Sequence, residues 1–240
     1  MRRHRSVGLI IITVFLFGCL CVAVSSHIGS ELFVNPVSAL SYATVILDAG
    51  HGGEDGGAVA RDGTNEKDLN LQITGNAALF LDLFGIPYHT VREGDCLIGD
   101  NSLPTVRERK VSDIHCRMEI VNGYPDGILL SIHQNMFPVE KYSGTQVFYA
   151  PDAAGSEELA DCIQAAVTQA LQPKNERRTK PTEGTVYLLD QAQRTSVMVE
   201  CGFLSNPAEL GKLKDPVYQS EMSYFIIKGL CEFFHNSSDS

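Results

Sequence analysis

Four ionisable residues occur where predicted strands end or a predicted helix begins: His51, Glu66, His133 and Glu200. Two imidazoles and one carboxylate form a ligand set that suits zinc when the fourth position is left for water. Zinc activates water, and a free carboxylate nearby can act as the general base when that water attacks an amide. His51, Glu66 and His133 are therefore candidate zinc ligands. Glu200 is the candidate acid/base, although spacing alone is not specific, because the ligands do not share an HExxH helix.

The segment around His51 is rich in glycine and follows an apolar run at 45–47, which predicts a buried strand that ends in an open loop. Such a loop could bind phosphate, hold a metal through His51, or simply turn the chain. Phosphate binding is disfavoured, because no Gly-Lys-Ser/Thr follows and Glu54 and Asp55 would repel an anion. A metal site and a plain turn both remain open at this point.

Two further apolar runs end in ionisable residues. The run 127–132 leads to His133, and the run 196–199 leads to Glu200. A glutamate at the end of a buried strand is disfavoured unless it is paired or functional. Because sites in open α/β sheets gather at the carboxyl ends of the strands, we expect these residues to lie at the same edge of a sheet.

Strands and helices alternate along the chain. Asn65 is the expected N-cap of a helix that ends at Gly85, which puts Glu66 in its first turn. The other expected helices cover 104–121, 155–171, a short segment after Asn206-Pro207, and 217–234, and the other expected strands cover 86–91, 143–150 and 185–189. This pattern predicts an α/β fold, a three-layer sandwich whose mainly parallel or mixed central sheet is flanked by helices.

The N-terminus predicts export. Three arginines within residues 1–6 precede an uncharged apolar segment, 7–24, which is long enough for a transmembrane helix. A cleaved signal peptide is the alternative. In either case the catalytic domain would lie outside the cytoplasmic membrane. The expected organisation is a basic stub at 1–6, an anchor or signal segment at 7–24, a linker at 25–42, a catalytic domain at 43–235 and a tail at 236–240.

Charge and cysteine content exclude several classes of site. The chain has a formal net charge of −10, which argues against nucleic acid as a partner. Its 7 cysteines contain no CxxC pair, so neither a disulfide framework nor a thiolate zinc site is indicated. We expect the cysteines of the exported part to be small apolar core residues.

Four blocks of the sequence resemble the signature blocks of the zinc-dependent N-acetylmuramoyl-L-alanine amidases (type 3): VILDAGHGG at 45–53, NEKDLNL at 65–71, SIHQN at 131–135 and VECGFLSN at 199–206. The resemblance implies His51, Glu66 and His133 as ligands of one zinc ion and Glu200 as the catalytic residue. It also implies peptidoglycan as the substrate, cleaved between N-acetylmuramic acid and the L-alanine of the stem peptide.

Within this family, the anchored N-terminus and the absence of a wall-binding repeat are most similar to the germination-specific amidases of the spore cortex. Those enzymes remove stem peptides on the way to muramic-δ-lactam. The segments 178–181 and 184–189 also resemble that subgroup. The implied partners are peptidoglycan strands and, through 7–24, the membrane. The same resemblance implies the forespore or cortex space as the location of the catalytic domain. No protein partner can be read from the sequence.

The sequence departs from the family pattern at three places. Ala49 replaces a usual proline, which predicts a looser loop around His51. Gln134 replaces a small or apolar residue and would alter substrate contacts if its amide faced the cleft. The segment between Asn135 and Ser143 is too short for the self-blocking helix of some cell-division amidases, so we expect no built-in plug.

Three alternative functions remain open from sequence. The chain could be a degenerate amidase that binds peptidoglycan without cleaving it, a vegetative cell-wall amidase, or a zinc carboxypeptidase that uses the same metal chemistry. The released fragment separates these classes: a whole stem peptide that begins with alanine indicates an amidase, and single amino acids indicate a carboxypeptidase.

Overall fold

The computed structural model describes residues 43–238. The predicted anchor or signal segment at 7–24 and the linker at 25–42 lie outside the described residues. None of the described helices is long and apolar enough to cross a membrane.

A mixed sheet of six strands forms the centre of the domain, in the order β2-β1-β3-β6-β4-β5. The strands are β1 (Val45–Ala49), β2 (Tyr88–Thr90), β3 (Ile128–Asn135), β4 (Gln146–Tyr149), β5 (Lys180–Pro181) and β6 (Ser196–Phe203). Strands β2, β1, β3 and β6 are parallel to one another, whereas β4 is antiparallel to β6. The carboxyl ends of β1, β3 and β6 therefore meet at one edge of the sheet.

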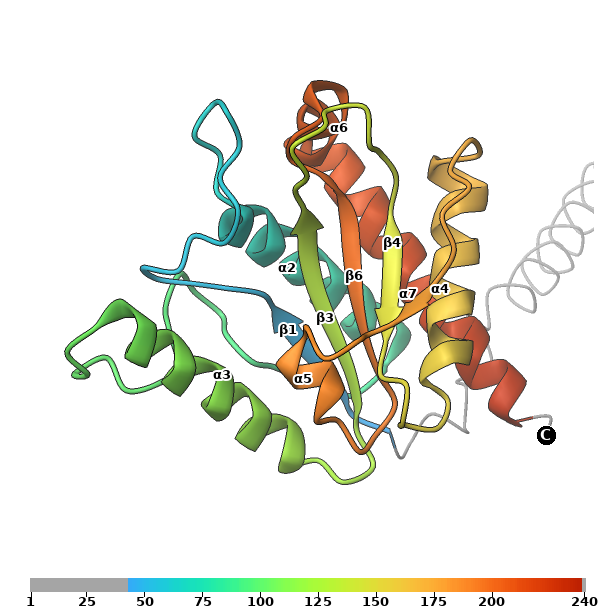
Figure 1. The fold of residues 1–240 in the computed structure, drawn as a ribbon. Coiled ribbons are helices and arrows are strands. Elements are labelled where there is room, and N and C mark those ends of the chain that lie inside the picture. Colours follow the sequence, from blue (N-terminus) through green and yellow to red (C-terminus); the bar gives the residue numbers. More distant parts are fainter. Residues whose placement is uncertain (1–42, 239–240) are drawn as a thin grey trace, which may run out of the picture. The chain divides into compact units, whose positions relative to one another are not determined.

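Helices cover both faces of this sheet (Figure 1). The helices are α2 (Glu66–Phe84), α3 (Val106–Asn122), α4 (Ser156–Leu171), α5 (Tyr187–Asp190), α6 (Pro207–Leu213) and α7 (Pro216–Ser238). One core cluster joins α2, α4 and α7 to one face, and a smaller cluster joins α3 and α5 to the other. Strands buried on both faces have apolar side chains in both directions, which explains the continuous apolar runs in the sequence. The predicted α/β fold is confirmed.

The prediction of a strand over Thr185–Leu189 is wrong, because these residues lead into the short helix α5. The carboxylate of Asp190 accepts hydrogen bonds from the backbone N–H of Val186 (2.8 Å) and of Gly184 (3.3 Å), which stabilises a tight turn instead of a strand. A short apolar run does not by itself distinguish a strand from a helix. Strand β5, in turn, lies between the expected helix at 155–171 and residue 185, where no strand or helix was predicted.

The expected helix ends are confirmed to within two residues, except that α7 ends at Ser238, four residues beyond the expected 234. Helix α3 begins at Val106 because Thr105, the residue after Pro104, forms a capping box with Glu108. Helix α2 ends at Gly85, whose φ of 68° is the left-handed conformation that closes a helix.

The expectation that the cysteines are core residues holds for one of the five that the described range contains. Cys201 is buried, Cys96 is exposed and Cys116, Cys162 and Cys231 are half-buried, and all five are free thiols. The expected absence of a disulfide framework therefore agrees with the described part of the chain.

Candidate functional site

The structure brings His51, Glu66 and His133 together at the edge where β1 and β3 end. One potential ligand atom from each residue lies within 4.8 Å of the others. Oε1 of Glu66 is 3.3 Å from Nε2 of His51 and 2.8 Å from Nδ1 of His133. Ligands of a tetrahedral zinc ion with bonds of about 2.1 Å are roughly 3.4 Å apart, so the donor set and its spacing fit a divalent metal.

His51 is oriented by the loop that follows β1. Its Nδ1 is 2.9 Å from Oδ2 of Asp55, which leaves Nε2 directed toward Glu66. Metal-binding histidines commonly have a carboxylate on the second ring nitrogen in this way. Burial acts to lower the pKa of His51, but the hydrogen bonds with Asp55 and Glu66 outweigh it and raise the pKa to about 9.

Glu66 is fixed by several donors at the start of α2. Its Oε2 accepts a hydrogen bond from the backbone N–H of Ala58 (2.9 Å), and its Oε1 accepts from Asn70 (3.2 Å) and from the backbone N–H of Gln134 (3.1 Å). Burial acts to raise the pKa of Glu66, but the hydrogen bonds with His133 and His51 lower it well below its usual range. This carboxylate is therefore ionised, as a metal ligand must be.

Glycines make room for the ligand side chains. A Cβ atom at Gly50 would lie 2.2 Å from both Cε1 and Nε2 of His133. At Gly57, where φ is +66°, it would lie 2.6 Å from Cδ2 of His51 and 2.7 Å from Oε2 of Glu66. The glycines of this loop thus allow the backbone to lie close to the candidate ligand side chains.

Replacing Gly50 with alanine should weaken metal binding, because the added methyl group must displace the imidazole of His133. Displacement of a ligand from its supported orientation costs about 10- to 100-fold in metal affinity. The measurement is a metal titration in competition with a chelator. Gly75→Ala on α2 is the matched control, since nothing lies within 4 Å of a Cβ there and affinity should not change. Equal affinity for the two variants would contradict this role of Gly50.

Glu200 lies beside His133, its direct partner across β3 and β6. Its Oε2 is buried and has no hydrogen-bond partner among the described residues. Burial raises the pKa of Glu200 to about 7, against the opposing charge effect of His133. A carboxyl group with a pKa near neutrality can both accept and return a proton, which is the requirement for a general acid/base.

Two buried arginines hold the loop that carries His51. Arg92 donates from Nε to the carbonyl oxygen of Ala49 (2.8 Å) and from Nη2 to that of Gly50 (3.1 Å). Arg117 donates to the carbonyl oxygens of Ala49 (3.0 Å) and His51 (2.7 Å). Neither arginine was predicted from the sequence. Ala49 was predicted to loosen this loop, but its carbonyl oxygen accepts hydrogen bonds from both guanidinium groups, and these bonds oppose the loosening.

Arg117 also belongs to a buried ion network. Its guanidinium contacts Asp48, at the end of β1, and donates from Nε to Asp113 (2.7 Å). Ser131 donates to the second oxygen of Asp48 at 2.7 Å. Burial acts to raise the pKa of Asp48, but Arg117 and Ser131 outweigh it and lower the pKa. Asp48, in a predicted buried strand, was the one feature of the sequence that indicated a buried cationic partner such as Arg117.

Two other histidines, His89 and His115, lie apart from this cluster. The ring of His89 packs near that of Tyr124, with centroids 5.3 Å apart, and the ring of His115 lies 5.5 Å from that of Tyr187. Gln134 is 3% exposed and donates to Asn70 (3.2 Å), so its amide supports the buried network and does not face the cleft.

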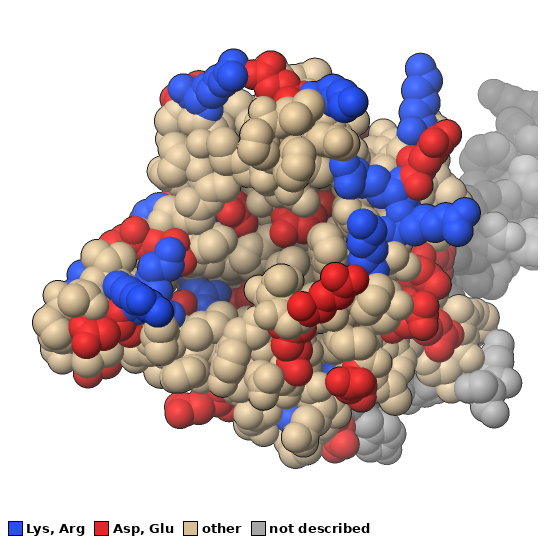
Figure 2. Space-filling model, viewed as in Figure 1, with Lys and Arg blue, Asp and Glu red and all other residues tan. Residues whose placement is uncertain are grey.

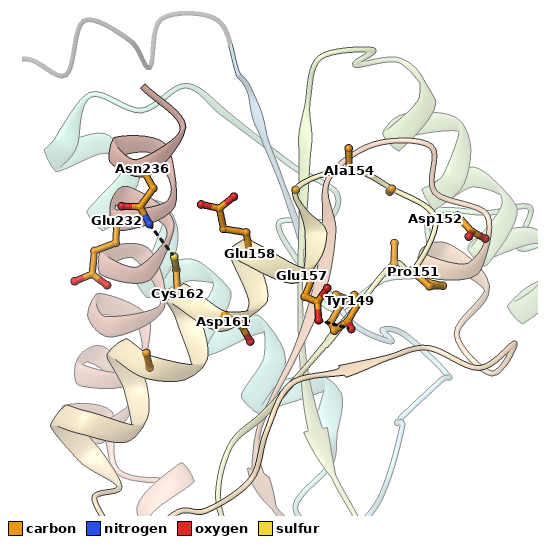
Figure 3. Close-up of a pocket in the computed structure, with 14 residues that line it drawn as sticks. Tyr149, Pro151, Asp152, Ala154, Glu157, Glu158, Asp161, Cys162, Glu232 and Asn236 are labelled. Carbon is orange, nitrogen blue, oxygen red and sulfur yellow. Dashed lines mark hydrogen bonds between the residues drawn. The ribbon is translucent and has the colours of Figure 1, made fainter. Parts of the chain in front are cut away.

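A separate cavity of about 1100 Å³ lies between the start of α4 and the end of α7 (Figure 3). Its lining includes Asp152, Glu157, Glu158, Asp161 and Glu232. The cavity includes none of the four residues at the carboxyl edge of β1, β3 and β6, and we assign no chemistry to it.

Comparison with known proteins adds independent evidence. Residues 45–232 match the family model described as N-acetylmuramoyl-L-alanine amidase. The germination-specific N-acetylmuramoyl-L-alanine amidase of Bacillus subtilis is 33% identical over 200 residues, which cover 83% of each chain.

Solved structures show the same similarity. The CwlD amidase from Clostridioides difficile, solved in complex with the GerS lipoprotein, matches with a TM-score of 0.77 and 37% identity, over 80% of this chain and 98% of that chain. An N-acetylmuramoyl-L-alanine amidase from Clostridium difficile 630 matches with a TM-score of 0.65 and 27% identity, over 80% of this chain and 97% of that chain.

Proposed function

Because this chain belongs to the N-acetylmuramoyl-L-alanine amidase family, we propose that it is a zinc-dependent hydrolase of the spore cortex, with His51, Glu66 and His133 as ligands and Glu200 as the acid/base. The amide that it cleaves joins N-acetylmuramic acid to the L-alanine of the stem peptide. The convergence of two imidazoles and one ionised carboxylate beside an unpartnered buried carboxyl group is the observation that carries this proposal.

The chain's own residues have distinct tasks in this reaction. A zinc ion in this site would supply Lewis acidity toward the amide carbonyl. Glu200 accepts the proton of the attacking water at its free Oε2 and returns it to the departing nitrogen. Asp55 holds the Nδ1 proton of His51, so that Nε2 stays available as a donor of electrons.

We expect substrate to reach the site without the prior release of a blocking segment. Residues 136–145, which follow β3, contain no helix. Figure 2 shows that this face of the molecule is hollowed between the α6 end and the α3–α5 layer. We infer that substrate reaches Glu200 directly from this side.

The cortex assignment rests on the similar proteins. The Bacillus subtilis relative is germination-specific, and the matching CwlD structure contains a bound lipoprotein. We therefore propose action on peptidoglycan outside the cytoplasmic membrane and a protein partner for this chain as well. A vegetative-wall substrate is the alternative within the same chemistry.

The product of the reaction tests the proposed function. Metal-loaded protein is incubated with cortex and with vegetative peptidoglycan, and the released fragments are identified by mass spectrometry. Intact stem peptides that begin with alanine, lost after chelation and restored by zinc, are the expected result. Release of single amino acids would indicate a carboxypeptidase, and binding without release would indicate a degenerate amidase.

Metal affinity should rise with pH. In the metal-free protein the pKa of His51 is about 9, so at pH 6 to 8 this ring is protonated and must lose a proton before it binds metal. Apparent zinc affinity should therefore rise about tenfold per pH unit up to about pH 9 from this residue alone. Chelator competition at pH 6, 7 and 8 measures the slope, and a flat profile would contradict the proton–metal competition at His51.

A further inference from the structure

Strand β5, at the edge of the sheet, carries Lys180 on the same face as Glu200, and Arg178 lies just before this strand. Gln146 pairs directly with Glu200 across β4 and β6, and Phe148 pairs with Lys180 across β4 and β5. Directly paired residues share a face of the sheet, as do residues two apart on one strand. Lys180 therefore lies on the face of Glu200, and Arg178 precedes it by two residues in the exposed segment that leads into β5.

The backbone of this segment is anchored from both sides. The side chain of Gln146 donates to the carbonyl oxygen of Arg178 (2.8 Å) and accepts a hydrogen bond from Arg177 (3.1 Å). On the opposite face, Thr179 donates to Asp161 of α4 (2.6 Å). These contacts hold residues 177–179 against β4 and α4, directly before β5, so that Arg178 and Lys180 both lie next to the strand that pairs with β6.

The two cations have no anionic partner of their own. Both side chains are exposed, and neither forms an ion pair within residues 43–238. By contrast, two cations near the loop that follows β1 have anionic partners: Arg109 pairs with Glu54, and Lys110 pairs with Asp55. Figure 2 shows Lys and Arg side chains gathered over the β4 and β5 side of the hollow. Unpaired cations beside the site of an acidic protein favour an anionic ligand.

The spacing matches a peptide that extends from the scissile bond. Strand β5 lies two strand spacings from β6, or about 10 Å. Two residues of an extended peptide cover about 7 Å of this distance, and a long Lys or Arg side chain covers the remainder. In a stem peptide the residue after alanine is a γ-linked glutamate, whose α-carboxylate is free when it is not amidated. We propose that Arg178 and Lys180 bind the free carboxylates of the stem peptide, so that the enzyme prefers acidic stems to amidated ones. This inference rests on the proposed function.

Steady-state kinetics on a matched pair of substrates test the proposal. The substrates are a synthetic muramyl tripeptide with a free glutamate α-carboxylate and the same molecule with that group amidated. The unmodified enzyme should have the lower KM for the acidic form. Arg178→Gln and Lys180→Gln should each raise that KM about 3- to 10-fold, with kcat within twofold and little change for the amidated form. Lys174→Gln, an exposed cation on the preceding loop, is the control.

A binding measurement separates this inference from the amidase assignment. Fluorescence anisotropy with labelled forms of both peptides, in a metal-loaded Glu200→Gln background, needs no turnover. If the Glu200→Gln protein bound the acidic peptide more tightly but the unmodified protein cleaved neither peptide, the amidase assignment would be contradicted. The proposed carboxylate site would still be supported. Equal affinity for the two peptides, or an Arg178→Gln effect of the same size on both, would overturn the carboxylate site.

Discussion

Replacing Glu200 with glutamine should reduce kcat for stem-peptide release by about 10²- to 10⁴-fold and leave the metal content unchanged. Glutamine has nearly the same shape but cannot accept the proton of the attacking water. Glu200 is not one of the three residues whose ligand atoms cluster, so the metal should remain bound. The measurements are the turnover of a defined muramyl peptide and the metal content of the purified protein.

The control for this variant is Glu119→Gln, an exposed glutamate on α3, which should retain full activity. His133→Ala provides the opposite pattern, because it should lose both metal and activity. A Glu200→Gln protein that had lost its metal would show that Glu200 is a ligand, and one that retained activity would show that another group moves the proton.

Replacing Arg117 with methionine should destabilise the fold by about 3–5 kcal/mol, the usual cost of leaving a buried charge without its partner. Arg117 is 2% exposed and contacts both Asp48 and Asp113. It also donates to the carbonyl oxygen of His51, so metal affinity should fall as well. Urea unfolding with and without metal measures both effects.

The pH dependence of the Arg117→Met protein distinguishes charge from packing. In the unmodified protein the pKa of Asp48 is lowered, so Asp48 contributes stability above about pH 4 that is lost as the pH falls. Without Arg117, burial raises the pKa of Asp48, and the variant should be least destabilised in acid. Arg107→Met, an exposed arginine on the same helix, should change stability by less than about 0.5 kcal/mol. A pH-independent loss would assign the effect to packing.

The four residues of the proposed site were predictable from the sequence because each follows a pattern that has a physical cause. His133 and Glu200 end apolar runs, and His51 follows one, so the parallel arrangement of β1, β3 and β6 had to bring them to one edge. Glu66 was predictable from its place after a helix N-cap.

The supporting residues were not predictable in the same way. Arg92 and Arg117 lie on a connecting segment and on a charged helix, where solvent exposure is the ordinary expectation. Their burial depends on hydrogen bonds to the carbonyl groups of residues 49–51. These groups come within reach of the two arginines only when the sheet is assembled. Likewise, the segment 185–189 has strand-like composition, but the carboxylate of Asp190 accepts hydrogen bonds from the backbone N–H of Gly184 and Val186, which favours a turn and a short helix.

The order of strands in the sheet has a consequence for biosynthesis. Strand β1 pairs with β3, whose residues come more than 80 positions later, and β3 pairs with β6 after a further long interval. Non-local pairings of this kind form late in folding, since the loops between them must first be closed at an entropic cost. The cluster of His51, Glu66 and His133 is incomplete until β1 meets β3, so a chain that is still being synthesised carries no finished chelate with which to capture metal ions.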